Sequence, residues 1–269
     1  MDGERNTRTG GNDGVGMEQK IAAALKRNRV PYVFGMPGGG SSIDLIQACQ
    51  REGIPFVLLQ HETAAALMAT VCGDLTNSCG VSVSIMATGA ANLAGGAAYA
   101  YLERHPLLCI TECYGSEQAP KMSLQKIDHT QVFSAYCKDS ITLGRFDAGS
   151  MIDQSVQLAK TERPGPIHLD YPMDPDAYGK SSTGMIFADV DSGVQSGDLD
   201  QVAATLNHAE KPLMIVGPVA LRENVSTRVV ELAERLQMPV MVTSKARGII
   251  SEDHPLYAGV MSGVYSVGT

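Results

Sequence analysis

Short apolar runs alternate with segments of helical character along the first two thirds of the chain, and a turn follows each run. The run IPFVLL, for example, leads into the alanine-rich segment ETAAALMATV. Strands that alternate with helices in this way predict a doubly wound parallel α/β sheet with helices on both faces. The strands are expected near Tyr32, Phe56, Val81, Leu107, Ile141 and Ile167.

The same pattern resumes toward the carboxyl end and predicts a partial second α/β domain. A strand over 212–216, a helix over 223–236 and a strand over 239–244 give the order strand, helix, strand. Helical spacing of the apolar residues in the middle segment indicates a face that packs on a core.

These patterns divide the 269-residue chain into four parts. We expect a first domain over 17–180 and an incomplete second domain over 198–269, joined by a linker over 181–197 that is rich in Gly, Ser and Asp. Residues 1–16 are polar and Gly-rich, so they are expected to form a disordered tail and not a signal peptide.

A carboxylate, Glu62, stands where the strand predicted over Pro55–Leu59 meets the following helix. Because this run is uniformly apolar, the strand is expected to be buried. In open α/β sheets, ligands bind at the carboxyl ends of the strands, where Glu62 would lie. The alternative is structural, since an acidic residue in the first turn of a helix complements the helix dipole.

Two glycine-bearing turns follow the neighbouring strands and are expected to face the same crevice. One is MPGGGS, residues 36–41, and the other is ATGAAN, residues 87–92, which precedes a helix expected from Leu93. Glycine allows a flat ligand to approach the backbone closely, although either turn could also be an ordinary flexible one. The first turn does not match the glycine patterns of dinucleotide-binding or P-loop proteins.

Composition excludes several classes of partner. The formal net charge is −8 and Lys and Arg form no stripe, so nucleic acid is not expected as a partner. The uncharged stretch between Asp74 and Glu103 is diluted by polar residues and split by a Gly-rich turn, so no membrane span is expected. The histidines lack the spacing of a zinc site, and no metal ligands are assigned.

The six cysteines contain no C-x-x-C pair and lie mostly among apolar residues. They are interpreted as reduced thiols of a cytoplasmic protein, in preference to a disulfide or metal framework. They are Cys49, Cys72, Cys79, Cys109, Cys113 and Cys137.

Four blocks of sequence, taken in order, resemble one known family. They are PYVFGMPGGGSSIDL, QHETAAALMA, VSIMATGAANLAGGAAYAYLERHPLLCIT and ERPGPIHLDYP. Together they resemble the pyrimidine-binding domain of thiamine-diphosphate-dependent 2-oxo acid enzymes, closest to the acetolactate synthase-like group. The segment LMIVGPVALRENVSTRVVELAERLQMPVMVTSKARG and its continuation are similar to the opening half of that family's central domain.

The resemblance implies a role for each matching residue. In this family, the glutamate at the position of Glu62 hydrogen-bonds the ring nitrogen N1′ of the cofactor's aminopyrimidine and so promotes proton removal from the thiazolium ring. Glu62 is therefore the expected catalytic residue. The other positions expected to contact the cofactor are Met36, Pro37, Gly38, Gly39, Thr88, Gly89, Asn92 and Gln125.

The sequence also departs from the family pattern. The usual G-P-G-A-T-N turn is ATGAAN here, and the usual F-Q-E element reads Leu124-Gln125-Lys126, which indicates different substrate handling. The Gly-Asp-Gly element that binds the diphosphate and magnesium in the family has no match, so the magnesium ligands are expected outside this chain. The resemblance leaves open whether a flavin, FAD, is bound.

Three hypotheses follow from the resemblance. The first is part of a thiamine-diphosphate enzyme that acts on a 2-oxo acid by decarboxylation and carboligation, as a lyase or transferase of branched-chain amino acid biosynthesis. It would act as a homo-oligomer, dimer or tetramer, or with a subunit that carries the diphosphate domain. The second is a noncatalytic, degenerate module that associates with other subunits. The third is a nucleotide-binding α/β protein that shares only the architecture.

Overall fold

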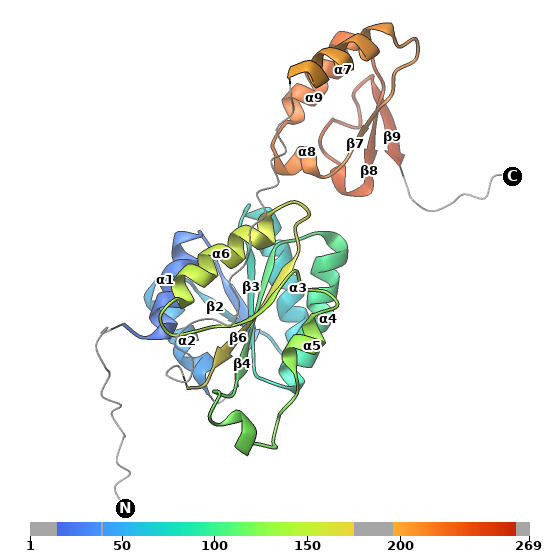
Figure 1. Ribbon diagram of the computed structural model, residues 1–269. Helices are drawn as coiled ribbons and strands as arrows, with labels where there is room; N and C mark the ends of the chain where they lie inside the picture. Colours follow the sequence, from blue (N-terminus) through green and yellow to red (C-terminus); the bar gives the residue numbers. More distant parts are fainter. Residues whose placement is uncertain (1–14, 39, 175–195, 262–269) are drawn as a thin grey trace, which may run out of the picture. The chain divides into compact units, whose positions relative to one another are not determined.

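Six parallel strands form the centre of the first unit, and their order in the sheet is β2-β1-β3-β4-β6-β5 (Figure 1). The computed structural model describes residues 15–38, 40–174 and 196–261. This arrangement confirms the predicted doubly wound parallel sheet. The strands are β1 Val33–Met36, β2 Phe56–Leu58, β3 Gly80–Ser84, β4 Leu107–Cys113, β5 Ser140–Thr142 and β6 Pro166–Pro172.

Helices cover both faces of this sheet, as Figure 1 shows. Alternate side chains of each strand point to opposite faces of the sheet. Val81 and Val83 of β3 join the apolar cluster on one face, and Leu107 and Cys109 of β4 join the cluster on the other face. One cluster lies under α1 Met17–Arg27, α2 Ser41–Arg51 and α6 Ala148–Lys160. The other lies under α3 Glu62–Leu75, α4 Thr88–Glu103 and α5 His129–Phe133, while a short 3₁₀ turn, η1 Ala119–Lys121, follows β4.

The prediction that the strand before Glu62 is buried was wrong. Strand β2 is at the edge of the sheet, and Leu58 is 69% exposed. An apolar run distinguishes poorly between a central strand and an edge strand, because the sequence does not state how many neighbours the strand will have. The carboxyl end of β2 still leads directly into α3, which begins at Glu62.

Helix α4 begins at Thr88, five residues before the expected start at Leu93. The ATGAAN segment is therefore mostly the first turn of a helix. Ala90 and Ala91 are strong helix formers and outweigh the helix-weakening effect of Gly89. As a result, Gly89 and Asn92 occupy fixed positions on one helical turn.

Helices α3 and α4 pack unusually closely because small residues face each other. A Cβ placed on Gly96 would lie 2.2 Å from Cβ of Ala66, well inside van der Waals contact. Both residues are buried in the cluster beneath the two helices. This close packing holds the first turns of α3 and α4, and hence Glu62 and Asn92, at a fixed separation.

The second unit contains a three-stranded parallel sheet of order β7-β8-β9. Chain contacts group residues 1–188 and 189–269 into two units, and most of the predicted linker 181–197 lies outside the described residues. The elements are α7 Ser196–His208, β7 Met214–Val216, α8 Val219–Arg222, α9 Ser226–Leu236, β8 Val240–Thr243, the 3₁₀ turn η3 Ser244–Ala246 and β9 Tyr257–Met261. The last two linker residues, 196 and 197, thus begin helix α7.

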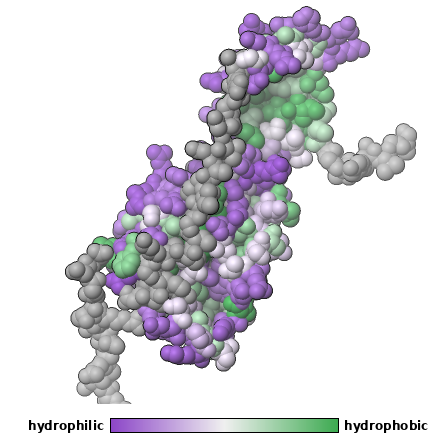
Figure 2. Space-filling view, viewed as in Figure 1, coloured by the Kyte–Doolittle hydropathy of each residue, from purple (hydrophilic) through white to green (hydrophobic). Residues whose placement is uncertain are grey.

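Apolar side chains also gather on the surface of the second unit (Figure 2). Ile215 on β7 and Met261 on β9 are 53% and 48% exposed. Within the described ranges, no helix combines the length and the apolar character needed to cross a bilayer.

We predict that Gly96→Ala destabilises the first unit. The added methyl group would force α3 and α4 apart, and overpacking of this kind costs about 1–3 kcal/mol. Thermal unfolding followed by circular dichroism should then show a Tm lower by roughly 2–10 °C. The control is Gly95→Ala on the exposed side of the same helix, where the new Cβ would meet only Thr63 side-chain atoms, the nearest at 3.3 Å. Equal Tm values for the two variants would contradict the packing argument.

Candidate functional site

Glu62 is a buried carboxylate at the start of α3. The helix is capped by the exposed His61, whose Nδ1 accepts a hydrogen bond from the Thr63 backbone at 3.2 Å. Glu62 itself is only 6% exposed, and Asn92 Nδ2 donates a hydrogen bond to its Oε2 at 3.0 Å. The Thr63 hydroxyl in turn donates to the Asn92 carbonyl, so the first turns of α3 and α4 are joined twice.

Burial argues against a purely structural role for Glu62. An acidic residue that only complements the helix dipole gains about 0.3–1 kcal/mol and can remain in water while doing so. Removing the charge from water costs several kcal/mol unless partners compensate it. Dipole complementation alone therefore does not explain why Glu62 is buried.

Ile85 brings the two glycine-bearing turns together. A Cβ on Gly38 would lie 2.7 Å from Cδ1 of Ile85, and a Cβ on Gly89 would lie 2.6 Å from Cγ2 of the same side chain. The same Cβ on Gly89 would lie 3.1 Å from Oε1 of Glu62. Gly38 and Gly89 therefore meet the same side chain, and Gly89 and Asn92 lie beside Glu62.

A second buried carboxylate, Glu112 at the end of β4, supports the first of these turns. Its Oε1 accepts a 2.7 Å hydrogen bond from the Ser42 backbone in the first turn of α2. A Cβ on Gly38 would lie 2.9 Å from Oε2, and a Cβ on Gly40 would lie 3.2 Å from Oε1. Larger residues at these positions would push the turn away from Glu112.

The remaining predicted site residues lie at varying distances from this centre. Met36 ends β1 and is 41% exposed, Pro37 is half-buried, and Thr88 is exposed at the start of α4. Gly39 lies outside the described residues. Gln125, at φ 51°, lines a separate cavity of about 150 Å³ together with His129 and Asp170. The structure thus groups Gln125 with a different set of polar side chains from those that contact Glu62.

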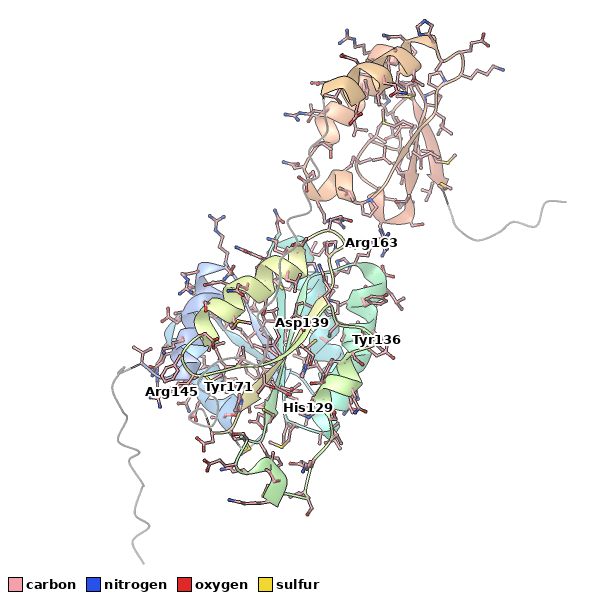
Figure 3. All side chains as sticks on the ribbon, in the orientation of Figure 1. His129, Tyr136, Asp139, Arg145, Arg163 and Tyr171 are labelled. Atoms are coloured by element: carbon pink, nitrogen blue, oxygen red, sulfur yellow. The ribbon has the colours of Figure 1, made fainter. Side chains whose placement is uncertain are left out.

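That set is a buried polar cluster on β4, β5, β6 and α5, which we call the His129 cluster; it consists of Thr111, His129, Ser140, His168 and Asp170. Strand register places Thr111 beside Asp170 and Ser140 beside His168. His129, which begins α5, reaches the cluster from outside the sheet (Figure 3). Its Nδ1 lies 2.7 Å from Oδ1 of Asp170.

Burial controls the ionisation of the imidazole at the centre of the cluster. It lowers the pKa of His168 from 6.5 to about 4, and the nearby Asp170 carboxylate only partly opposes this shift. His168 also stacks on Phe133, with ring centroids 4.0 Å apart. Burial likewise raises the pKa of the Cys113 thiol, which lines the same cavity.

Sequence reasoning missed both Glu112 and the His129 cluster. It set the histidines aside because they lack the spacing of a zinc site, and it made no assignment for Glu112. One signal was available in HLD, because His168 and Asp170 are two residues apart on a strand and so share a face. The register that adds Thr111 and Ser140 is not readable from the sequence.

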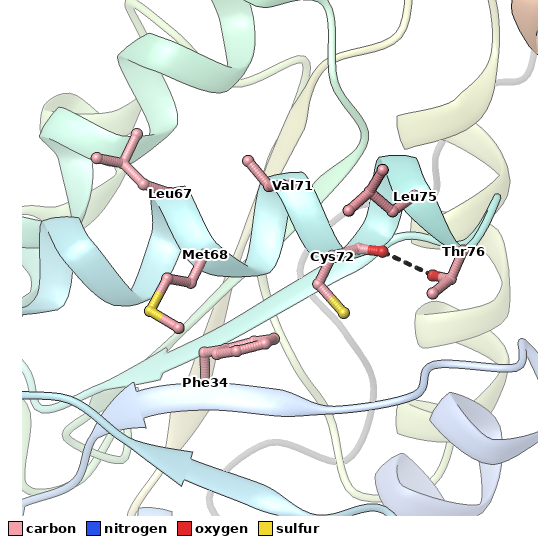
Figure 4. Close-up of a pocket in the computed structure, with 7 residues that line it drawn as sticks. All are labelled: Phe34, Leu67, Met68, Val71, Cys72, Leu75 and Thr76. Carbon is pink, nitrogen blue, oxygen red and sulfur yellow. Dashed lines mark hydrogen bonds between the residues drawn. The ribbon is translucent and has the colours of Figure 1, made fainter.

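An apolar hollow of about 480 Å³ lies along α3, away from the polar groups (Figure 4). Met68, Val71 and Leu75 on this helix are 45%, 48% and 82% exposed. The Cys72 backbone carbonyl, which accepts a 2.7 Å hydrogen bond from Thr76, is one of few polar groups there. The complete lining is Phe34, Leu67, Met68, Val71, Cys72, Leu75 and Thr76. All six cysteines of the chain are free thiols.

Comparison with known protein families identifies the family. Residues 16–132 match the N-terminal TPP binding domain of thiamine pyrophosphate enzymes, and residues 199–268 match the central domain of the same enzymes. The chain belongs to the thiamine pyrophosphate enzyme family. Glu62, Gly38, Gly89 and Asn92 all lie within the segment that matches the family's TPP binding domain.

Curated relatives point to one group within this family. The chain is 30% identical to an acetolactate synthase of Arthrospira platensis over 91% of its length, and 28% identical to a probable acetolactate synthase large subunit of Methanocaldococcus jannaschii over 90%. It is 25% identical over 89% of its length to human 2-hydroxyacyl-CoA lyase 1. The chain spans 44%, 42% and 42% of these relatives, respectively.

We predict that His168 makes stability depend on pH. Between about pH 6.5 and 4 the unfolded chain binds a proton at this residue that the folded chain does not. The lowered pKa of His168 contributes about 3 kcal/mol to the free energy of unfolding when the residue is neutral in both states. This contribution is complete above pH 6.5 and is lost as the pH falls toward 4. Urea denaturation at pH 7 and pH 4.5 should show a smaller acid loss in His168→Gln than in the wild type.

The control for this prediction is His208→Gln, which alters an exposed histidine on α7. NMR titration of the wild-type His168 ring gives a direct measurement even if His168→Gln folds poorly. A ring that titrates near its ordinary value would contradict the prediction.

Proposed function

We propose that the first unit binds the aminopyrimidine ring of thiamine diphosphate against Glu62. The observation that carries this proposal is the buried Glu62 carboxylate, which accepts a hydrogen bond from Asn92 where two glycine-bearing turns meet. The match of this segment to the family's TPP binding domain supports it independently.

The chemistry of these groups fits an aminopyrimidine. Such a ring is flat and carries both hydrogen-bond donors and acceptors, so it suits a site made of exposed backbone and one carboxylate. Asn92 engages Oε2 of Glu62, while Oε1 lies beside Gly89. Ile85 provides an apolar surface between the two turns.

Each residue has a specific task in this proposal. Glu62 accepts a hydrogen bond from a ring nitrogen and stabilises the proton there. Asn92 fixes the orientation of the carboxylate, and the small residues between α3 and α4 keep the two helices in register. When bound, thiamine diphosphate supplies an electron sink for decarboxylation of a 2-oxo acid and for carbon–carbon bond formation.

We further propose that the complete enzyme is a lyase or transferase of the acetolactate synthase type. Relatives named acetolactate synthase support this assignment, and the chain spans 44% or less of their length. We place magnesium with the diphosphate, on ligands outside this chain. A bound flavin would be recognised from the visible absorption of the purified enzyme. We place the reaction in branched-chain amino acid biosynthesis in the cytoplasm, where free thiols are the normal state of cysteine.

The alternative is a noncatalytic module that keeps the fold. It is favoured by the two residues beside Gln125. Leu124 and Lys126 stand where the F-Q-E element of the family has phenylalanine and glutamate. Leu124 is 69% exposed. In this alternative the chain would associate with other subunits without binding the cofactor.

The apolar face of α3 supports association with a second copy of the chain. Monomeric proteins rarely leave contiguous apolar surface of this extent in water. Met68, Val71 and Leu75 expose such a surface beside the 480 Å³ hollow. A second copy that packs here would bury this surface, which lies on the helix that begins at Glu62.

We predict that Glu62→Gln weakens cofactor binding. Glutamine can still accept a hydrogen bond from Asn92, but it loses the negative charge that stabilises a protonated ring nitrogen. A charge-assisted hydrogen bond contributes about 1.5–3 kcal/mol, so the Kd should rise roughly 10-fold or more. Isothermal titration with thiamine diphosphate and magnesium would measure it, with the chain alone and with a diphosphate-domain partner.

The matched control is Glu52→Gln, the same substitution at an exposed residue at the far end of α2. Unchanged affinity is expected for the control. If wild type, Glu62→Gln and Glu52→Gln all fail to bind with the partner present, the noncatalytic alternative is correct.

We predict that Leu75→Glu shifts the chain toward the monomer. Burial of a charged residue in an apolar interface is unfavourable, whereas the same residue in water leaves the fold intact. Sedimentation velocity over a range of concentrations should show a dimer dissociation constant at least about 10-fold higher, equivalent to 1.4 kcal/mol. Leu199→Glu on α7, which replaces a leucine that is 58% exposed, is the control. A monomeric wild type at all concentrations would refute self-association.

A further inference from the structure

The His129 cluster is connected to the turn beside Glu62 through the backbone amide of Ala87. The amide of Ala87 donates a hydrogen bond to Nε2 of His129 at 3.0 Å. Ala87 immediately precedes α4 and has φ 55° and ψ −102°, a conformation that L residues rarely adopt. Since Gly89 and Asn92 follow within one and a half turns, the backbone at Ala87 sets where α4 begins.

The direction of this hydrogen bond fixes the proton on His129. Because Ala87 N–H donates, Nε2 must present a lone pair, and the proton of the neutral ring lies on Nδ1. Nδ1 is 2.7 Å from Oδ1 of Asp170, which accepts that proton in a charge-assisted hydrogen bond. A ring protonated at both nitrogens would place two donors face to face at Ala87.

The hydrogen bonds in the rest of the cluster are consistent with a proton on Nδ1 of His129. The Thr111 hydroxyl donates its one proton to Asp170 at 2.8 Å, so its 2.8 Å contact with His168 must be a hydrogen bond from Nε2–H of His168. Nδ1 of His168 then accepts from the Ser140 hydroxyl at 2.6 Å. Every hydroxyl and ring proton is accounted for, and Asp170 accepts the protons of Thr111 and His129.

The composition of the cluster also resembles a metal site, because ligand atoms of His129, His168 and Asp170 lie within 4.8 Å of one another. The hydrogen bonds argue against a metal. A separation of 2.7 Å between Nδ1 of His129 and Asp170 is that of two groups sharing a proton, and Nε2 of His129 already accepts from Ala87.

We propose that His129 is a positioning residue for the cofactor site: with its tautomer set by Asp170, it holds the Ala87 amide and thereby the first turn of α4, which carries Gly89 and Asn92. Asn92 then orients Glu62 through the 3.0 Å hydrogen bond. The chain of contacts runs from Asp170 on β6 through His129 on α5 to α4. Its effect on cofactor affinity rests on the function proposed above.

The test begins with the ligand-free full chain uniformly labelled with ¹⁵N. Long-range ¹⁵N–¹H correlation spectra should show His129 protonated on Nδ1 and His168 protonated on Nε2, and the Ala87 amide should be protected from hydrogen exchange. A His129 ring protonated on Nε2, or an unprotected Ala87 amide, would overturn the proposal. So would a stoichiometric zinc ion, added as zinc chloride, that binds through these residues.

Two substitutions separate positioning from simple packing. In His129→Leu the volume is largely kept but the acceptor is lost, so exchange of the Ala87 amide and the Kd for thiamine diphosphate should each rise about 10-fold, which corresponds to one hydrogen bond. His129→Gln can place its carbonyl oxygen near the position of Nε2 and should restore both values to within about 3-fold of the wild type. Equal behaviour of the two variants would overturn the proposal.

Thr111→Val is the control within the cluster. It removes a hydroxyl that contacts Asp170 and His168 but leaves the contact between His129 and Ala87, so the Ala87 amide should stay protected. If the wild-type chain does not bind thiamine diphosphate, the proposed function fails. The tautomer and the exchange rates still decide whether His129 positions the turn.

Discussion

The arrangement of the site depends on one hydrogen bond, from the Asn92 amide to the buried carboxylate of Glu62. It joins the first turns of two helices that follow different strands, so it forms only when the sheet, both turns and both helices are in place. The positive end of α3 lowers the cost of keeping the charge out of water, and the amide offsets more of it. In the part of the chain that the structure describes, the printed hydrogen-bond partner of this buried carboxylate is a neutral amide and not a cation.

Close packing makes this hydrogen bond geometrically feasible. Small residues between α3 and α4 let the helix backbones approach until Gly96 touches Ala66. Ile85 fills the space beneath both glycine-bearing turns, and Glu112 fastens the turn before α2. Larger residues at Gly38, Gly89 or Gly96 would separate the groups that surround Glu62, although glycine itself carries no charge.

The sequence was sufficient to predict the alternation of strands and helices in the first unit, the position of Glu62 at a strand end, and the family. These features depend on local periodicity and on short motifs, which are encoded in neighbouring residues. It did not reveal that β2 is an edge strand or that Thr111 lies beside Asp170, because both are consequences of how strands pair. The early start of α4 was missed since a Gly-bearing turn and the first turn of an alanine-rich helix have similar composition.

The division of polar groups into two sets explains why one strand end was easier to interpret than another. Around Glu62, Asn92 contacts the carboxylate directly and Gly89 lies beside it on the same helical turn. The His129 cluster instead draws one residue each from β4, β5 and α5 and two from β6. Its path to Glu62 runs through the backbone of Ala87 and then through Asn92. A backbone amide has no sequence signature, so a coupling that passes through one can be inferred only from coordinates. Sites in doubly wound folds therefore extend beyond the strand ends that carry recognisable motifs, along whichever neighbouring strands the register brings into contact.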